Sequence, residues 1–139
     1  IAMADHNYYS TFIAVAPDTA AMQGTVPPPY RGRETVAGIQ HRLLTEQPYL
    51  RTQEEVLFLT DWIKQGHAPD AATEADRQAF FDQPRACLRA SPLCKQYGWG
   101  IHFDKQGRAA LYPMEGQEYR RLAADPLITQ LKAMRSKRA

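Results

Sequence analysis

The chain has little of several features that mark whole classes of protein. It has only two cysteines, Cys87 and Cys94, and their spacing matches neither a CxxC redox motif nor a zinc ribbon. Its four histidines stand singly, without an HxxxH or HExxH pair, so no metal site is expected. It also lacks GxGxxG and GxxxxGK[ST], the glycine-rich motifs that bind nucleotide phosphates, and we expect no cofactor.

Long apolar runs and a strong charge of one sign are absent as well. No apolar run approaches the roughly 20 residues of a membrane-spanning helix, and no signal-peptide pattern opens the chain. We therefore expect no membrane segment, a cytoplasmic location and free cysteine thiols. Seventeen basic residues nearly balance fifteen acidic ones, so nucleic-acid binding is not expected. The basic end, residues 132–139, favours a solvent-exposed helix end, with a phosphate-binding tail as the alternative.

The length of the chain suits one domain. A hydrophobic content of 44% over 139 residues is enough for one ordinary core, and no internal repeat or low-complexity tract divides the sequence. Met3 stands where a natural initiator would, which predicts that Ile1 and Ala2 were added in front of it. We expect a single domain over residues 3–139.

The N-terminal half contains clear signals for one strand and two helices. Residues 8–16 predict a strand, because β-branched and aromatic side chains fill the segment. Residues 24–32 hold three successive prolines and predict an extended loop. Apolar residues at helical spacing predict a helix over 35–46. Thr52 and Glu55 form a capping-box motif that begins a second helix over 53–65.

The segment that follows contains weaker signals. Thr73 with Asp76 predicts the start of a short third helix that carries Phe80 and Phe81. A short strand is expected at residues 87–90.

Two helices are expected at the C-terminal end. Residues 115–124 predict a short helix. Asp125 before Pro126 is a helix-start signal, and it predicts a terminal helix with an apolar stripe. The stripe consists of Leu127, Ile128, Leu131 and Met134.

A hairpin is predicted over residues 98–113. Asp104 and Gly107 bound a turn in which a glycine closes the hairpin loop. With Asp104 opposite Arg108, the register pairs Phe103 with Ala109, His102 with Ala110, Ile101 with Leu111, and Gly100 with Tyr112. One face then carries core residues, namely Trp99, Ile101, Phe103, Ala109 and Leu111. The other face carries Gly98, Gly100, His102, Ala110 and Tyr112.

The glycine face of this hairpin is the candidate binding site. Glycines at alternate strand positions, Gly98 and Gly100, predict that a ligand or a helix approaches the backbone closely there. A cation, hydroxyls and an imidazole around a shallow floor suit a small anionic molecule. The candidate ligand-binding residues are Arg89, Ser91, Tyr97, His102 and Tyr112. In the alternative interpretation, a helix packs on the glycines and these residues are structural.

The sequence identifies no catalytic residue. Ser91, His102 and Asp104 contain the groups of a catalytic triad, but no nucleophile elbow surrounds Ser91. Cys87 or Cys94 could act as a nucleophile only in a setting that stabilises a thiolate, which spacing does not reveal. A cysteine-dependent enzyme therefore stays an alternative, and whether the chain is an enzyme stays open.

These elements predict an α+β fold. A small antiparallel sheet is built from the strand at 8–16, the short strand at 87–90 and the hairpin at 98–113. It packs against the helices at 35–46 and 53–65, and the terminal helix completes that layer. The helical runs do not alternate with strands as βαβ units do, which excludes a parallel α/β sheet.

Five segments along the chain form a recognisable pattern. They are NYYSTFI at 7–13, EVLF at 55–58, CLRASPL at 87–93, YGWGIH at 97–102 and KAMRSK at 132–137. The pattern resembles a family of small bacterial proteins known only as a domain of unknown function. Members usually approach the position of Cys87 through a KGQPC-like segment, whereas this chain has DQPRAC at 82–87, which weakens any role for that turn. The resemblance implies a freestanding bacterial cytoplasmic domain and brings no established activity.

Two functional interpretations follow. The first is binding of a small anionic molecule near residues 89–112, without catalysis. The alternative is a protein-interaction or homodimerisation module that uses the proline loop at 25–32 and the edge of the strand at 8–16.

Overall fold

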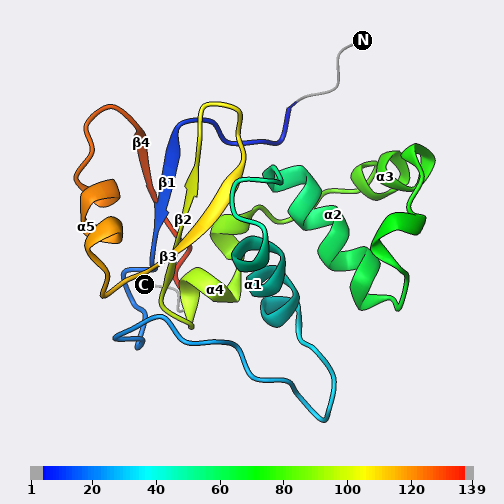
Figure 1. Cartoon of the computed structure of the whole chain (residues 1–139), viewed down its shortest axis with the longest axis horizontal. Helices are drawn as coiled ribbons and strands as arrows, with labels where there is room; N and C mark the ends of the chain where they lie inside the picture. Colours follow the sequence, from blue (N-terminus) through cyan, green and yellow to red (C-terminus); the bar gives the residue numbers. More distant parts are fainter. Residues whose placement is uncertain (1–4, 137–139) are drawn as a thin grey trace.

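A mixed four-stranded sheet is the centre of the fold (Figure 1). The computed structural model describes residues 5–136, so Ile1, Ala2, Met3 and the last basic residues lie outside it. The strands are β1 (Thr11–Ala14), β2 (Trp99–Phe103), β3 (Ala109–Pro113) and β4 (Thr129–Lys132), in the order β3-β2-β1-β4. β1, β2 and β3 pair antiparallel, whereas β4 runs parallel to β1. The α+β prediction is confirmed, although the sheet is not purely antiparallel.

The predicted hairpin is confirmed in its register. Phe103 pairs with Ala109, Ile101 with Leu111, and Gly100 with Tyr112. Gly107 closes the turn with a φ of 80°, a conformation that glycine adopts freely. The Asp104 carboxylate accepts the backbone N–H groups of Gln106 and Arg108, both at 2.9 Å, which holds the turn.

The predicted helices up to residue 124 are confirmed by the structure, each near its expected bounds. They are α1 (Val36–Glu46), α2 (Gln53–Lys64), α3 (Glu74–Phe81) and α5 (Gln117–Ala123). Thr35 caps α1, and the capping box of Thr52 and Glu55 begins α2. A short helix, α4 (Pro92–Lys95), and the 3₁₀ turns Pro69–Ala71 and Leu88–Ala90 complete the set. No helix within residues 5–136 is long and apolar enough to cross a membrane.

Helices cover both faces of the sheet. Helices α1, α2 and α4 lie on one side of the sheet in Figure 1. Their buried side chains pack against those of the strands. The core there consists of Ile13, Leu44, Val56, Leu88, Leu93, Ile101 and Phe103, among others. On the opposite face lies α5, whose Tyr119 ring packs edge-on against Phe12 at 5.0 Å between centroids. The expectation of helices on one face was therefore incomplete.

The predicted short strand at 87–90 is wrong. Leu88–Ala90 forms a 3₁₀ turn, in which Ala90 and Ser91 donate their N–H groups to the carbonyls of Cys87 and Leu88. The Leu88 side chain is fully buried and its backbone N–H is bonded to a side chain of α2. The segment makes one backbone bond next to β4, from the N–H of Met134 to the carbonyl of Arg89, but no ladder.

The predicted terminal helix is also wrong, because the segment forms β4. The Asp125 carboxylate accepts the N–H of Leu127 at 2.9 Å, but this bond closes a turn rather than starting a helix. Leu127 is 88% exposed, so the apolar stripe has no helix-packing partner at that position. Thr129 instead donates its N–H to the carbonyl of Ser10 at 2.8 Å, and pairing with β1 outweighs the helix signal.

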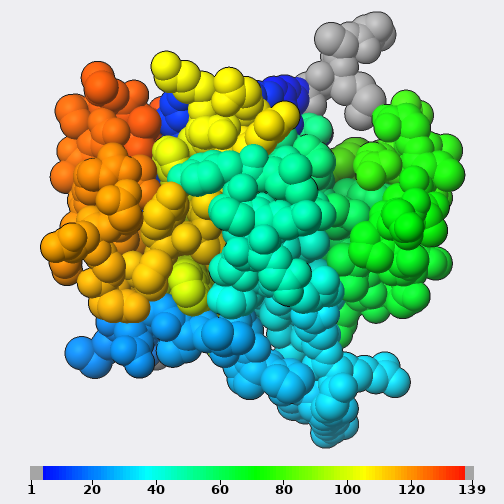
Figure 2. All heavy atoms as spheres, in the orientation of Figure 1, coloured from blue at the N-terminus to red at the C-terminus, as the bar shows by residue number. Residues whose placement is uncertain are grey.

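The proline loop is exposed, whereas β1 is not an edge strand. Val26 is 69% and Tyr30 65% exposed, and Figure 2 shows this part of the chain projecting from the body of the molecule. Trp99 Nε1 donates to the carbonyl of Thr25 at 2.7 Å and fixes the start of the loop. Because β2 and β4 flank β1, its edges are not free for a partner, which corrects one part of the interaction hypothesis.

Candidate functional site

The glycine face of the hairpin is covered by the chain itself. A Cβ atom at Gly100 would lie 2.5 Å from Phe12 Cζ and 2.7 Å from Tyr119 Cε2. A Cβ atom at Gly98 would lie 2.1 Å from the carbonyl oxygen of Gln23. The predicted close approach is real, and the approaching groups come from β1, α5 and the loop before the prolines. The arrangement agrees with the interpretation in which a helix packs on the glycines.

His102 and Tyr112 lie together on this face, and Tyr49 joins them. The Tyr49 hydroxyl oxygen is 2.8 Å from His102 Nδ1 and 2.6 Å from the Tyr112 hydroxyl. Tyr49 has a φ of 57°, a strained conformation for a non-glycine residue, held by its N–H bond to the carbonyl of Ala109. Burial lowers the pKa of His102 and raises the pKa of Tyr49. His102 and Tyr49 are therefore neutral at pH 7, and neither has a charge to attract an anion.

The lowered pKa of His102 predicts a loss of stability in mild acid. Because the unfolded chain binds this proton at higher pH than the folded chain, the contribution is present above about pH 6.5 and is lost as the pH falls. The negative charges of Asp104 and Asp125 raise the pKa of His102 and so oppose the effect of burial, whereas the positive charge of Arg121 lowers this pKa further. Between pH 7.5 and pH 5 the free energy of unfolding should fall less for His102→Gln than for the unmodified chain, measured by urea denaturation. If the free energy of unfolding fell equally in the two proteins, the pKa of His102 would be the same in the folded and the unfolded chain.

Ser91 and Tyr97 are used inside the protein. Ser91 is buried, and its hydroxyl donates to Gln40 Oε1 at 2.5 Å while accepting the N–H of Leu93 at the start of α4. Tyr97 packs against the main core, and its carbonyl accepts the N–H of Thr25. Neither residue makes a hydrogen bond with the His102 trio, so the structure does not bring the five sequence candidates into one group.

A second group of polar residues surrounds the half-buried Cys87. We name the hollow beside it the Cys87 groove; it has a volume of about 470 Å³ and is walled by residues 5–8, the first turns of α2 and residues 81–87. A smaller hollow of about 260 Å³ shares Arg85 and Cys87 with the groove and also reaches Ser91 and Lys64. Cys87 is therefore accessible from two hollows.

Tyr8 is the side chain that contacts the Cys87 thiol. Tyr8 and Cys87 both line the Cys87 groove. Burial, and after it the interaction with Cys87, raises the pKa of Tyr8 to about 12, while the positive charge of Arg89 lowers it. A phenol, a thiol and a guanidinium therefore lie within electrostatic range of one another.

Gln53 at the start of α2 holds these segments together. It is buried; its amide nitrogen donates to the carbonyl of His6, and its amide oxygen accepts the N–H of Leu88 at 2.9 Å. Asn7 accepts the N–H of Glu54 through its side-chain oxygen, also at 2.9 Å. These bonds fasten the N-terminal segment and the turn after Cys87 to the same end of α2, which places Tyr8 next to the thiol.

Two arginines flank Cys87 in the sequence, and each is fixed by one hydrogen bond. Arg85 Nε donates to the carbonyl of Phe80 at 2.9 Å, with its guanidinium 3.9 Å from the centre of the Phe80 ring. Arg89 Nε donates to the carbonyl of Lys132 at 2.8 Å. Within residues 5–136, neither arginine forms an ion pair with a carboxylate. Their terminal Nη groups are left for other partners.

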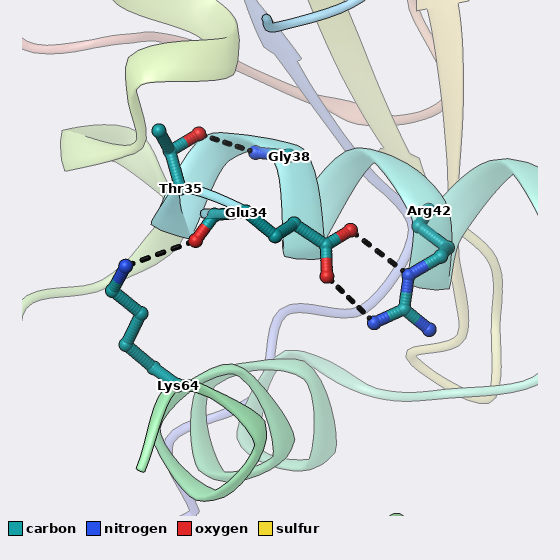
Figure 3. Close-up of polar contacts among 5 residues, drawn as sticks. All are labelled: Glu34, Thr35, Gly38, Arg42 and Lys64. Carbon is teal, nitrogen blue, oxygen red and sulfur yellow. Dashed lines mark hydrogen bonds and ion pairs between the residues drawn. The ribbon is translucent and has the colours of Figure 1, made fainter. Parts of the chain in front are cut away.

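Arg42 is an arginine whose charge is paired with a carboxylate. Its Nε and Nη2 both donate to the Glu34 carboxylate, each at 3.0 Å, in the paired geometry of Figure 3. Lys64, which reaches the smaller hollow, donates to the carbonyl of Glu34 at 2.9 Å rather than to its carboxylate. Arg85 and Arg89, like most arginines of residues 5–136, have no such counter-charge.

Cys94 has a different environment from Cys87. It is fully buried between the helices and the sheet, and burial raises the pKa of its thiol. Of the two cysteines, only Cys87 is placed to meet a ligand or reagent in the folded protein. In the part of the chain that the structure describes, no group of three or more histidine, cysteine or acidic residues could hold a metal ion.

Sequence reasoning missed three residues of the Cys87 groove. Gln53 resembles any polar residue in the first turn of a helix, and its burial depends on segments far away in the chain. Tyr8 was assigned only to a strand face, and Arg85 only to a turn. One signal in the sequence could have pointed to this groove. The segments NYYSTFI and CLRASPL are both part of the family pattern, and they contain Tyr8 and Cys87, which line the same groove in the fold.

Comparison with known proteins identifies a family but no activity. No curated protein and no solved structure matches the chain. One family model covers residues 3–139, which is nearly the whole sequence and agrees with the resemblance seen in its motifs. The chain therefore belongs to the family described as a family of unknown function (DUF6157).

Proposed function

We propose that the chain binds a small anionic molecule in the Cys87 groove, with Arg85, which lines the groove, as the contacting cation and Arg89 as a second positive charge that acts on Tyr8 in its wall. The observation that carries the proposal is that both guanidinium groups are oriented by a backbone carbonyl, yet neither has a carboxylate partner within residues 5–136. A guanidinium fixed through Nε presents its two Nη groups as a fork, which suits a carboxylate or a phosphate. Of the five sequence candidates, the proposal uses the charge of Arg89, and Ser91 lines the adjoining hollow.

The shape and polarity of the groove narrow the class of ligand. A volume of about 470 Å³ lies within the usual range of small-molecule sites. Asp5 and Asp82 also line the groove, so a molecule with several negative charges would be repelled. The best match is a ligand with one anionic group for the arginines and a hydroxyl or amine for the aspartates.

Loss of ligand binding on replacement of Arg89 is the expected test result. Thermal unfolding is followed for the unmodified chain and Arg89→Ala with inorganic phosphate, sugar phosphates, hydroxy acids and amino acids. A ligand at 100 times its dissociation constant adds about 2.7 kcal/mol, which raises the melting temperature by several degrees for a chain of this size. The rise should vanish in Arg89→Ala and return in part with Arg89→Lys, since lysine keeps the charge but not the fork.

Two further variants act as controls for location. Arg33→Ala removes an exposed arginine directly after the proline loop and should leave the response to ligand unchanged. His102→Ala changes the trio on the other face of the sheet and should also leave it unchanged. If His102→Ala abolished the response while Arg89→Ala kept it, the binding site would lie on the hairpin and not in the Cys87 groove.

Thiol chemistry at Cys87 is a second candidate function. The thiol is half-buried, lines two hollows and lies in the same groove as Tyr8, so a reagent or substrate can reach it in the folded protein. In such a reaction Cys87 would be the nucleophile and the arginines would hold the anionic group of the substrate.

Selective labelling of Cys87 in the native protein is expected. Iodoacetamide should modify Cys87 readily and Cys94 only after unfolding, because Cys94 is fully buried. Mass spectrometry of peptides measures both rates, and Cys87→Ser gives the background. A rate profile for Cys87 with an ordinary midpoint near pH ~8.5 would argue against a catalytic role. Faster labelling of Cys94 would contradict the arrangement of the core.

A further inference from the structure

The outer side of β4 is a sheet edge that no strand covers within residues 5–136. β4 stands at the end of the strand order and pairs only with β1. Thr129 donates its N–H to the carbonyl of Ser10, so the backbone N–H and C=O groups of the alternate residues Gln130 and Lys132 point away from the sheet. Of the four residues of β4, Thr129, Gln130 and Lys132 are exposed and Leu131 is half-buried.

Arg89 covers only the C-terminal half of this edge. Its Nε donates to the carbonyl of Lys132 at 2.8 Å, and its own carbonyl accepts the N–H of Met134 at 2.9 Å. The N–H and C=O of Gln130 and the N–H of Lys132 have no backbone partner among the described residues. These groups are available to a further strand.

The side chains along the edge have a definite character. Arg89, Lys132 and Arg135 give it positive charge. Leu127, 88% exposed, and Met134, 44% exposed, lie before and after β4 and add apolar surface at each end. The edge therefore combines free backbone groups, positive charge and two apolar contacts.

We infer that the outer edge of β4 binds an extended acidic segment of a partner protein by strand addition. A strand opposite Gln130 would exchange both backbone hydrogen bonds with it, as in an antiparallel pair. Glutamate or aspartate on that strand would face Lys132 and Arg135, and apolar residues would reach Leu127 and Met134. A second copy of this chain is disfavoured as the occupant, because it would set its own Lys132 against the same cations.

Binding of a synthetic acidic strand tests the inference. The probe is a fluorescent peptide of about eight alternating valines and glutamates, close to the length of a long strand. We expect saturable binding that weakens as salt is raised, and a loss of roughly tenfold or more in affinity for the double variant Lys132→Glu, Arg135→Glu. A peptide with valines and lysines in the same order should not bind.

A second pair of variants separates backbone pairing from simple charge attraction. Gln130→Pro removes an outward N–H without breaking a bond to β1 and should abolish binding, whereas Gln130→Ala removes only the side chain and should retain it. Two further peptides carry N-methyl groups on alternate residues, one on the odd residues and one on the even residues. The peptide in which the methyl groups replace the N–H groups that face β4 should not bind. This test remains valid if Gln130→Pro fails to fold. The Gln130 variants and the methylated peptides change neither the Cys87 groove nor Arg89, so failure in these tests leaves the small-molecule proposal standing.

Three outcomes would overturn the inference. The first is equal affinity of Gln130→Pro and Gln130→Ala together with indifference to peptide methylation. The second is equal competition by an oligonucleotide of the same charge, which would make the surface a general polyanion site. The third is a dimer in light scattering that Gln130→Pro converts to a monomer, which would make a second copy the occupant.

Discussion

Gly98→Ala is expected to lower the free energy of unfolding by about 4 kcal/mol, from backbone strain and steric overlap together. Gly98 has a φ of 79°, a conformation that costs an alanine roughly 1–2 kcal/mol. The new Cβ would also lie 2.1 Å from the carbonyl oxygen of Gln23, a backbone atom that cannot turn aside as a side chain can. Urea denaturation followed by fluorescence of Trp62 and Trp99 measures the loss.

Gly32→Ala is the matched control for this result. Gly32 has a φ of 75°, and nothing lies within 4 Å of the position of its Cβ, so only the conformational cost applies. The difference between the two variants isolates the overlap with Gln23. Equal losses in both would show that the loop before the prolines moves away from β2 at little cost.

Phe103→Ala is expected to lower the free energy of unfolding by about 3–5 kcal/mol, the range for a buried phenylalanine. Phe103 is fully buried, and its ring packs edge-on against Tyr8 with 5.5 Å between centroids. The variant should therefore also loosen Tyr8 and speed the labelling of Cys87. Thermal and urea unfolding measure the stability, and iodoacetamide measures the thiol.

Phe103→Leu and Met22→Ala show whether the effect is specific. Phe103→Leu keeps most of the volume and should cost only about 1 kcal/mol. Met22 is 87% exposed, so Met22→Ala should change stability by less than about 0.5 kcal/mol. An unchanged rate of Cys87 labelling in folded Phe103→Ala would mean that Tyr8 is positioned without the Phe103 ring.

The parts of the fold that the sequence predicted are those governed by local signals. The turn between Asp104 and Gly107 sets the register of the hairpin, and Thr52 with Glu55 begins α2, in each case through neighbours in the chain. The segment after Asp125 has an equally local helix signal, but Thr129 pairs with Thr11 far away in the sequence. Nothing within the segment itself reveals that partner.

The candidate site was harder to predict for the same reason. Alternate glycines correctly indicated close approach to Gly100, but the approaching ring belongs to Tyr119 of α5, which local pattern does not position. Arg89 and Cys87 were named from their chemistry alone. Their relation to Tyr8 depends on Gln53, a residue whose buried hydrogen bonds join three segments that are distant in sequence.

The place of β1 in the sheet has a consequence for how the protein is made. β1 leaves the ribosome before β2 and β4, the strands that cover its two sides, because both come much later in the chain. During translation, the apolar strand around Phe12 and Ile13 therefore has no strand paired with either of its edges. Nascent chains that stop before β4 should be aggregation-prone and should depend on chaperones until the last strand arrives.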